Sequence, residues 1–210
     1  MISSEKYAII CSIIRKYIIL KKKMIPIKNR KKTLEATVEE MKNFSFAYIE
    51  KYSPSKQQLK TYLLKKYLRA KLTNVKKQDL SNLIDIVILE LEKSKFLSDK
   101  FYSESKAKNL IQRGSSINKI RNYLLSKGIN NEYIKETISK INEKNEDQDF
   151  FSAIKVCKKK RIGPSRPEDN RELFYKKDIA ILGRNGFSFE TSKRVMDLEK
   201  EDYLKIINFL

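Results

Sequence analysis

Apolar side chains recur along this chain at the spacing of an α-helix. The clearest run is residues 80–91, in which Leu, Ile or Val occupies positions 80, 83, 84, 87, 88 and 91. Intervals of three and four place these side chains on one face of a helix. After Thr33, no run combines sustained apolar–polar alternation with turn residues at both ends, as a strand would. The pattern therefore predicts an all-α fold from Thr33 onward.

Residues typical of helix ends separate these apolar runs. Ser55, followed three positions later by Gln58, has the form of a capping box. Pro167, with Glu168 and Asp169 after it, suits a first helical turn. Further N-cap candidates, in chain order, are Ser98, Asp99, Ser116, Asn130 and Ser188. Gly128 and Gly186 each precede an apolar residue and a new N-cap, so we expect both to end helices in the left-handed conformation.

One sequence pattern occurs twice, and a looser copy of it occurs a third time. Residues 59–66 (LKTYLLKK) match residues 120–127 (IRNYLLSK), and residues 182–188 (LGRNGFS) match residues 124–130. The middle copy resolves into helices at about 98–113, 116–127 and 130–142, and three helices can close a small bundle. We therefore expect three tandem three-helix units. Their expected bounds are residues 33–97, 98–145 and 146–210.

Residues 1–32 lie outside this repeat and read as a basic extension. Tyr7 to Leu20 is mostly apolar but too short to span a membrane, and Arg15 and Lys16 interrupt it. An amphipathic helix on a membrane surface is one interpretation. We favour an extension with little role, or a start at Met24.

The chain has 46 basic and 26 acidic residues, a formal net charge of +20. The excess is spread over most of the chain and fades in residues 143–210. A lysine-rich solvated surface would explain it, but a repeated helical surface with this charge favours a nucleic acid or a polyanionic assembly as partner.

The residue types argue against an enzyme. The chain has no His, which excludes His-based acid–base catalysis and mixed Cys/His zinc sites. It has no GxxxxGK[ST] loop for nucleotide phosphates. Cys11 and Cys157 lie far apart, which fits buried thiols in a reducing cytoplasm. We expect a cytoplasmic, monomeric protein without catalytic residues, metal or cofactor.

Three segments, in the same order and spacing, resemble the bacterial RecX regulatory proteins. The first is residues 46–60, from Phe46 to Lys60. The second is residues 96–129, with FLSDKFY at 96–102, Arg113-Gly114, and IRxxLxxKGI at 120–129. The third combines KKRIGP at 159–164 with KKDIAxLGRNGFS at 176–188. Ser98, Ser103 and Ser116 replace an aspartate, an alanine and a glycine of the family pattern. The resemblance covers about residues 33–200.

The resemblance implies a non-enzymatic regulator of the recombinase RecA. Proteins of this family are three tandem three-helix units in an elongated curved rod. They lodge in the groove of the RecA–DNA filament and restrain filament growth and strand exchange. The alternative is an autonomous, basic helical nucleic-acid-binding or architectural protein that does not act on RecA. For the regulator we expect weaker, salt-dependent binding to bare DNA, whereas the alternative predicts tight binding to bare DNA.

Basic side chains on or beside the repeated helices are the candidate partner-binding residues. Tyr62, Tyr67 and Tyr123 lie among them and could stack on bases, although their spacing favours core packing. A solvated surface is the alternative role for any single lysine. The candidates are Lys60, Lys65, Lys66, Arg69, Arg113, Lys119, Arg121, Lys127, Lys158, Lys159, Lys160, Arg161, Arg184 and Arg194.

Overall fold

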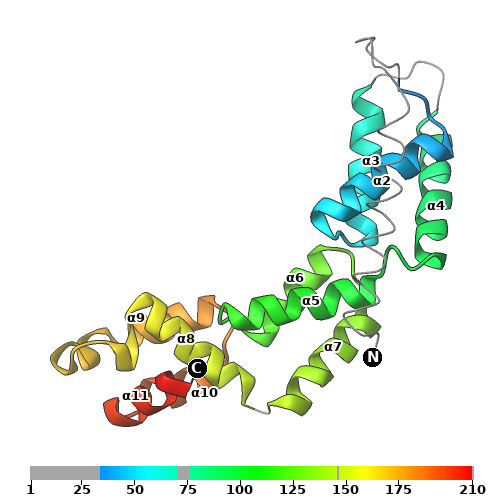
Figure 1. Ribbon diagram of the computed structural model, residues 1–210. Coiled ribbons are helices and arrows are strands. Elements are labelled where there is room, and N and C mark those ends of the chain that lie inside the picture. Colours follow the sequence, from blue (N-terminus) through cyan, green and yellow to red (C-terminus); the bar gives the residue numbers. More distant parts are fainter. Residues whose placement is uncertain (1–33, 71–75, 146, 210) are drawn as a thin grey trace, which may run out of the picture. The chain divides into compact units, whose positions relative to one another are not determined.

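The computed structural model describes residues 34–70, 76–145 and 147–209, and these residues are helical with short connections (Figure 1). No strand occurs in these ranges, so the all-α prediction is confirmed for them. Tyr7, Leu20 and Met24 of the N-terminal extension lie outside the described residues. The α-helices are α2 (Val38–Tyr52), α3 (Lys56–Arg69), α4 (Lys77–Lys93), α5 (Asp99–Gln112), α6 (Ile117–Ser126), α7 (Asn131–Lys144), α8 (Gln148–Lys160), α9 (Arg171–Arg184), α10 (Phe189–Met196) and α11 (Lys200–Phe209).

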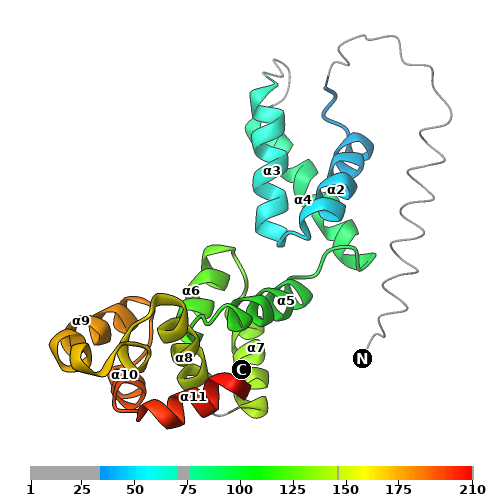
Figure 2. The same cartoon turned by 60° about the vertical axis from the view of Figure 1, so that its left-hand side comes forward.

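Helices α2, α3 and α4 pack against one another around the apolar stripe of α4 (Figures 1 and 2). The stripe is buried, as its spacing predicts, except that Leu83 is only half-buried. Met41 of α2 and Leu63 and Tyr67 of α3 are also buried. Burial of such side chains stabilises the fold by roughly 1.5–3 kcal/mol each.

Helices α5, α6 and α7 pack on one another in the same way. Their bounds agree with the ranges expected for the middle repeat. Ile134 and Ile138 are buried and Ile141 is half-buried, so one apolar face of α7 packs into this core. The buried cluster consists of Tyr102, Ala107, Ile120, Leu124, Ile129, Ile134 and Ile138.

The C-terminal part of the described chain is more elaborate, because α11 and two 3-10 helices join α8, α9 and α10. The 3-10 helices are η1 (Gly163–Ser165) and η2 (Glu168–Asn170). Cys157 of α8 is buried as expected, and burial raises the pKa of its thiol to about 12. The buried cluster consists of Ala153, Ile154, Val156, Cys157, Ile162, Leu182, Phe187, Val195, Met196 and Tyr203.

Most predicted helix ends are confirmed. The predicted capping box joins Ser55 to Gln58. Side chains at the other predicted N-caps accept hydrogen bonds from first-turn N–H groups, namely Ser98, Ser116, Asn130 and Ser188. Two details differ. Asp99 is the first helical residue of α5 rather than its cap. The turn after Pro167 is the 3-10 helix η2, and the α-helix begins only at Arg171.

Two joints of the same design connect α3 to α6 and α6 to α9. In the first joint, the hydroxyl of Ser55 donates to the carbonyl oxygen of Lys127 at 2.8 Å. The N–H of Lys56 donates to Oδ1 of Asp99 at 2.9 Å. The N-terminus of α3 therefore bonds the last carbonyl of α6 and the first residue of α5, which satisfies groups that helix ends leave without partners.

The second joint repeats this arrangement between α6 and α9. The hydroxyl of Ser116 donates to the carbonyl oxygen of Asn185 at 2.9 Å. The N–H of Ile117 donates to Oδ1 of Asp149, in the first turn of α8, at 2.8 Å. Because the partners lie 69 and 32 residues away along the chain, both bonds are long-range.

A glycine at each joint lets the two helix ends approach. Gly128 and Gly186 have φ of +74° and +89°, as predicted for residues that end helices in the left-handed conformation. An added Cβ would lie 2.6 Å from Cβ of Gln57 at the first joint and 2.6 Å from Oγ of Ser116 at the second. Glycine is therefore required both for the backbone angle and for the space.

A buried carboxylate ties the loop after α8 to α9. Asp178 is fully buried and accepts from the N–H of Gly163 at 2.8 Å. Arg166 donates to both of its oxygens, at 2.6 and 2.9 Å. Gly163 of the motif KKRIGP is thus part of a structural anchor.

Candidate functional site

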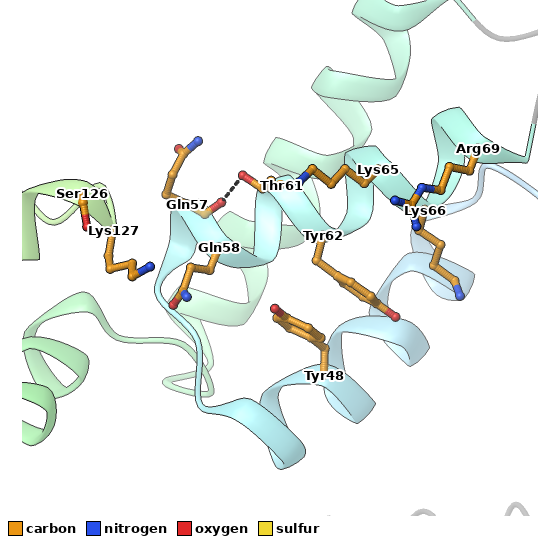
Figure 3. Close-up of a pocket in the computed structure, with 10 residues that line it drawn as sticks. All are labelled: Tyr48, Gln57, Gln58, Thr61, Tyr62, Lys65, Lys66, Arg69, Ser126 and Lys127. Atoms are coloured by element: carbon orange, nitrogen blue, oxygen red, sulfur yellow. Dashed lines mark hydrogen bonds between the residues drawn. The ribbon is translucent and has the colours of Figure 1, made fainter. Parts of the chain in front are cut away.

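Seven of the fourteen candidate basic residues line two hollows, each of about 570 Å³. The first, which we call the tyrosine hollow, is formed by α2, α3 and the end of α6. Its lining residues are Tyr48, Gln57, Gln58, Thr61, Tyr62, Lys65, Lys66, Arg69, Ser126 and Lys127 (Figure 3).

Two tyrosine rings form a wall of the tyrosine hollow. Tyr48 of α2 and Tyr62 of α3 lie nearly parallel, with ring centroids 4.1 Å apart and 9° between the planes. Both are half-buried, whereas Tyr67, one turn further along α3, is buried in the core. Burial raises the pKa of Tyr62, and the neighbouring Tyr48 and Tyr52 add to the effect. Tyr62 is therefore neutral at physiological pH and does not repel an anion.

The cations of α3 fall into two groups. Lys56 and Lys60 form ion pairs with Glu92 and Asp85 of α4, at 2.9 and 2.6 Å. In the second half of the helix, Lys66 lies 3.8 Å from the centroid of the Phe44 ring.

Lys65 and Arg69 both belong to α3, and both are exposed (Figure 3). Among the described residues, neither has an acidic partner. Lys127, across the first joint, lies 5.2 Å from the centroid of the Tyr123 ring. The cations at the tyrosine hollow therefore remain available to an anionic partner.

The second hollow, which we call the lysine hollow, lies where the end of α5 meets α8. It is lined by Gln112, Arg113, Lys155, Lys158, Lys159 and Ile207. Gly114 makes the approach possible, because its φ is +78° and an added Cβ would lie 3.0 Å from Cβ of Lys155. Four cations meet here, and none has an acidic partner among the described residues. Their mutual repulsion favours binding of an anion.

The remaining candidates lie outside the two hollows. Arg121, Lys160, Arg161 and Arg184 are exposed, and Arg161 ends α8 in the left-handed conformation. Lys119 lies at the second joint, 3.5 Å from Oδ1 of Asn185.

The Arg194 side chain already interacts with other groups of the protein. It forms an ion pair with Asp147 at 3.1 Å and lies 4.7 Å from the centroid of the Phe150 ring. The Arg194 guanidinium also lowers the pKa of the Asp147 carboxyl. Like Lys60, Arg194 is therefore less available to an anion than the unpaired cations of the hollows.

Lys155 and Tyr48 are among the lining residues that were not candidates. Lys155 could have been found, because it lies three and four positions before Lys158 and Lys159 and so shares their helix face. Tyr48 could not, since no spacing rule pairs it with Tyr62 on another helix.

Two proteins that are similar to this chain have the same name. The regulatory protein RecX of Myxococcus xanthus (strain DK1622) is 29% identical over 159 residues, which cover 75% of this chain and 84% of that protein. The chain is therefore similar to a RecX regulatory protein over three quarters of its length. The regulatory protein RecX of Agrobacterium fabrum is 27% identical over 114 residues, 54% of this chain and 59% of that protein.

The RecX fold is also found among solved structures. A crystal structure of regulatory protein RecX matches with a TM-score of 0.53 and 16% identity, over 87% of this chain and 86% of that one. No protein-family model matches the chain. In the part of the chain that the structure describes, no helix is long and apolar enough to cross a membrane.

Proposed function

We propose that this protein binds the RecA–DNA filament and restrains the recombinase, without catalysing a reaction itself. The similarity to regulatory protein RecX over three quarters of the chain carries this proposal. The unpaired cations of the two hollows support it, because a filament that contains DNA presents phosphates. RecA and DNA are accordingly its partners.

The proposal includes an arrangement of the helices. The chain would act as a monomer of three tandem units, bounded as the repeat predicts, in an elongated curved rod. The two joints support this arrangement because each uses a Ser, an Asp and a Gly at equivalent places. A series of equivalent units suits a partner that is itself a repeating polymer.

DNA-dependent ATP hydrolysis by RecA tests the proposal. RecA should be assembled on single-stranded DNA, and the full-length protein should then be added below one molecule per RecA protomer. We expect inhibition at this substoichiometric ratio, because restraining filament growth affects many protomers at once.

Two controls make the result interpretable. Electrophoretic mobility of bare DNA should be measured over the same protein concentrations, to exclude simple competition for DNA. Unchanged ATP hydrolysis together with tight binding to bare DNA would contradict the regulator and favour the autonomous DNA-binding protein.

A further inference from the structure

The tyrosine hollow combines two stacked tyrosine rings with cations that have no acidic partner among the described residues. The rings of Tyr48 and Tyr62 stack on each other, with centroids 4.1 Å apart and 9° between their planes, so each keeps one outer face for a further ring. Both remain partly exposed to a hollow of about 570 Å³, a size typical of ligand sites. Such a surface fits another flat ring.

The charges around this wall fit a phosphate-bearing ligand. Lys65 and Arg69 follow Tyr62 along α3, and Lys127 approaches from the end of α6 (Figure 3). By contrast, Lys56 and Lys60, at the start of the same helix, are neutralised by acids of α4. The positive charge of α3 is thus concentrated beside the tyrosines.

We propose that the tyrosine hollow is a binding site for single-stranded DNA, in which a base stacks on the outer face of Tyr62, whose inner face lies against Tyr48, while neighbouring phosphates contact Lys65, Arg69 and Lys127. Stacking on aromatic side chains, with cations that follow the backbone, is the usual way in which proteins hold single strands. In a duplex the bases are already stacked and paired, so a duplex can offer this hollow only its phosphates. The polar side chains of Gln57 and Thr61 also line the hollow and suit base edges.

This inference rests on the DNA-binding part of the proposed function and adds the form of DNA that one site prefers. It does not depend on inhibition of RecA. The two can therefore fail separately.

Fluorescence anisotropy with labelled oligodeoxythymidylate, and with a duplex of equal length, tests the site on the full-length protein. Tyr62→Leu should weaken single-strand binding about 5- to 100-fold, the loss expected for one stacked base. Binding of the duplex should change less than about twofold. Tyr62→Phe, which keeps the ring, should bind both DNAs like the parent.

Tyr175→Leu is the matched control. This half-buried tyrosine of α9 donates its hydroxyl to Asp197 at 2.8 Å and does not line the tyrosine hollow. The variant should bind single strands like the parent. Equal losses for Tyr62→Leu and Tyr175→Leu, or equal losses of single-strand and duplex binding by Tyr62→Leu, would overturn the proposal.

A charge variant tests the phosphate contacts independently of the fold around Tyr62. Lys65→Gln with Arg69→Gln should lower the slope of log affinity against log salt by about 1.4, since each phosphate contact contributes about 0.7 on single strands. An unchanged slope would show that these cations do not touch the phosphates.

Crosslinking tests the site in the unaltered protein. Oligonucleotides containing 5-iododeoxyuridine should be irradiated in the complex, and the linked peptides identified by mass spectrometry. We expect links to Tyr48 or Tyr62. Links found only elsewhere would overturn the site. Inhibition of RecA by a Tyr62→Leu variant that binds single strands normally would leave the regulator intact and remove this inference.

Discussion

At the scale of single residues, one buried carboxylate, Asp178, shows how a polar group is accommodated in the core. Asp178 differs from the surface carboxylates because it is fully buried. Its two oxygens accept three hydrogen bonds. Burial alone would raise the pKa of this carboxyl, but Arg166 and the Gly163 N–H outweigh burial and lower it. Asp178 is therefore ionised in the folded protein at neutral pH.

Replacing Asp178 with Asn should destabilise the protein by about 2–4 kcal/mol at pH 7. The variant leaves Arg166 without its counter-charge, and loss of one partner from a buried pair is costly. Urea unfolding measures the effect.

The contribution of Asp178 to the free energy of unfolding should decrease as the pH falls. Because the folded-state pKa of Asp178 is lowered, its contribution is complete above the unfolded value of about 3.9 and is lost as pH falls through the folded value. The difference between parent and Asp178→Asn should therefore shrink below about pH 4. A difference that stays constant from pH 7 to pH 3 would contradict this role.

At the scale of elements, the joints give the serine caps a second role. Ser116 accepts a hydrogen bond from the N–H of Lys119 within its own helix and donates one to Asn185 on another. Asp149 completes the second joint by accepting from Ile117. Burial raises the pKa of Asp149, and this N–H only partly offsets the effect. The joint therefore uses the carboxylate as an acceptor more than as a charge.

Two substitutions of Asp149 distinguish its role as a hydrogen-bond acceptor from the effect of its negative charge. Asp149→Ala leaves the first-turn N–H of Ile117 without its acceptor and should cost about 1–2 kcal/mol. Asp149→Asn keeps an oxygen acceptor and removes the buried charge, so its stability should lie within about 0.5 kcal/mol of the parent. Thermal unfolding at pH 7 measures both.

Amide hydrogen exchange shows whether the loss of stability arises at the Ile117 N–H, from which Asp149 accepts a hydrogen bond. The amide of Ile117 should exchange faster in Asp149→Ala than in Asp149→Asn, since only the first variant frees it. Asp169→Ala, a change at an exposed acid of η2, is the control. Equal exchange at Ile117 in all three variants would show that the joint does not depend on this acceptor.

The sequence predicts helix positions well because helix ends are encoded locally. Ser55, Ser116 and Gly128 mark ends within one turn of themselves, and the stripe of α4 specifies its own buried face. The joint partners of Ser55 and Ser116 lie 72 and 69 residues away, and no local rule specifies them. The same limit applies to the site, since Lys65 and Arg69 share a helix face but Tyr48 joins them only through tertiary packing.

At the scale of the whole molecule, the positive charge divides into cations that are paired and cations that are not. The lysine hollow contains unpaired ones, namely Arg113, Lys155, Lys158 and Lys159. Folding keeps these like charges together, which costs free energy unless a partner supplies the opposite charge.

Neutralising the lysine hollow should weaken binding without harming the fold. We expect the triple change Arg113→Gln, Lys158→Gln and Lys159→Gln to reduce inhibition of RecA. On duplex DNA it should lower the salt slope by up to about 2.7, since each phosphate contact contributes about 0.9. Thermal stability should be unchanged or higher, because repulsion is relieved and exposed charges otherwise contribute little.

A triple change of equal charge elsewhere is the control. Lys93, Lys108 and Lys135 are exposed and line neither hollow. Their replacement by Gln should leave inhibition closer to that of the parent. If both triple variants lose inhibition equally, net charge rather than the lysine hollow determines binding.

The two joints also bear on how such a chain can grow in evolution. Each uses a serine and a first-turn N–H on one side, and an aspartate and a glycine-terminated helix on the other. Residues 98–145 therefore supply one half of each joint, with Asp99 and the Lys127 carbonyl in the first and Ser116 in the second. Duplication of that segment within the gene would create matching halves at every new boundary, so the protein could be lengthened without a new kind of interface.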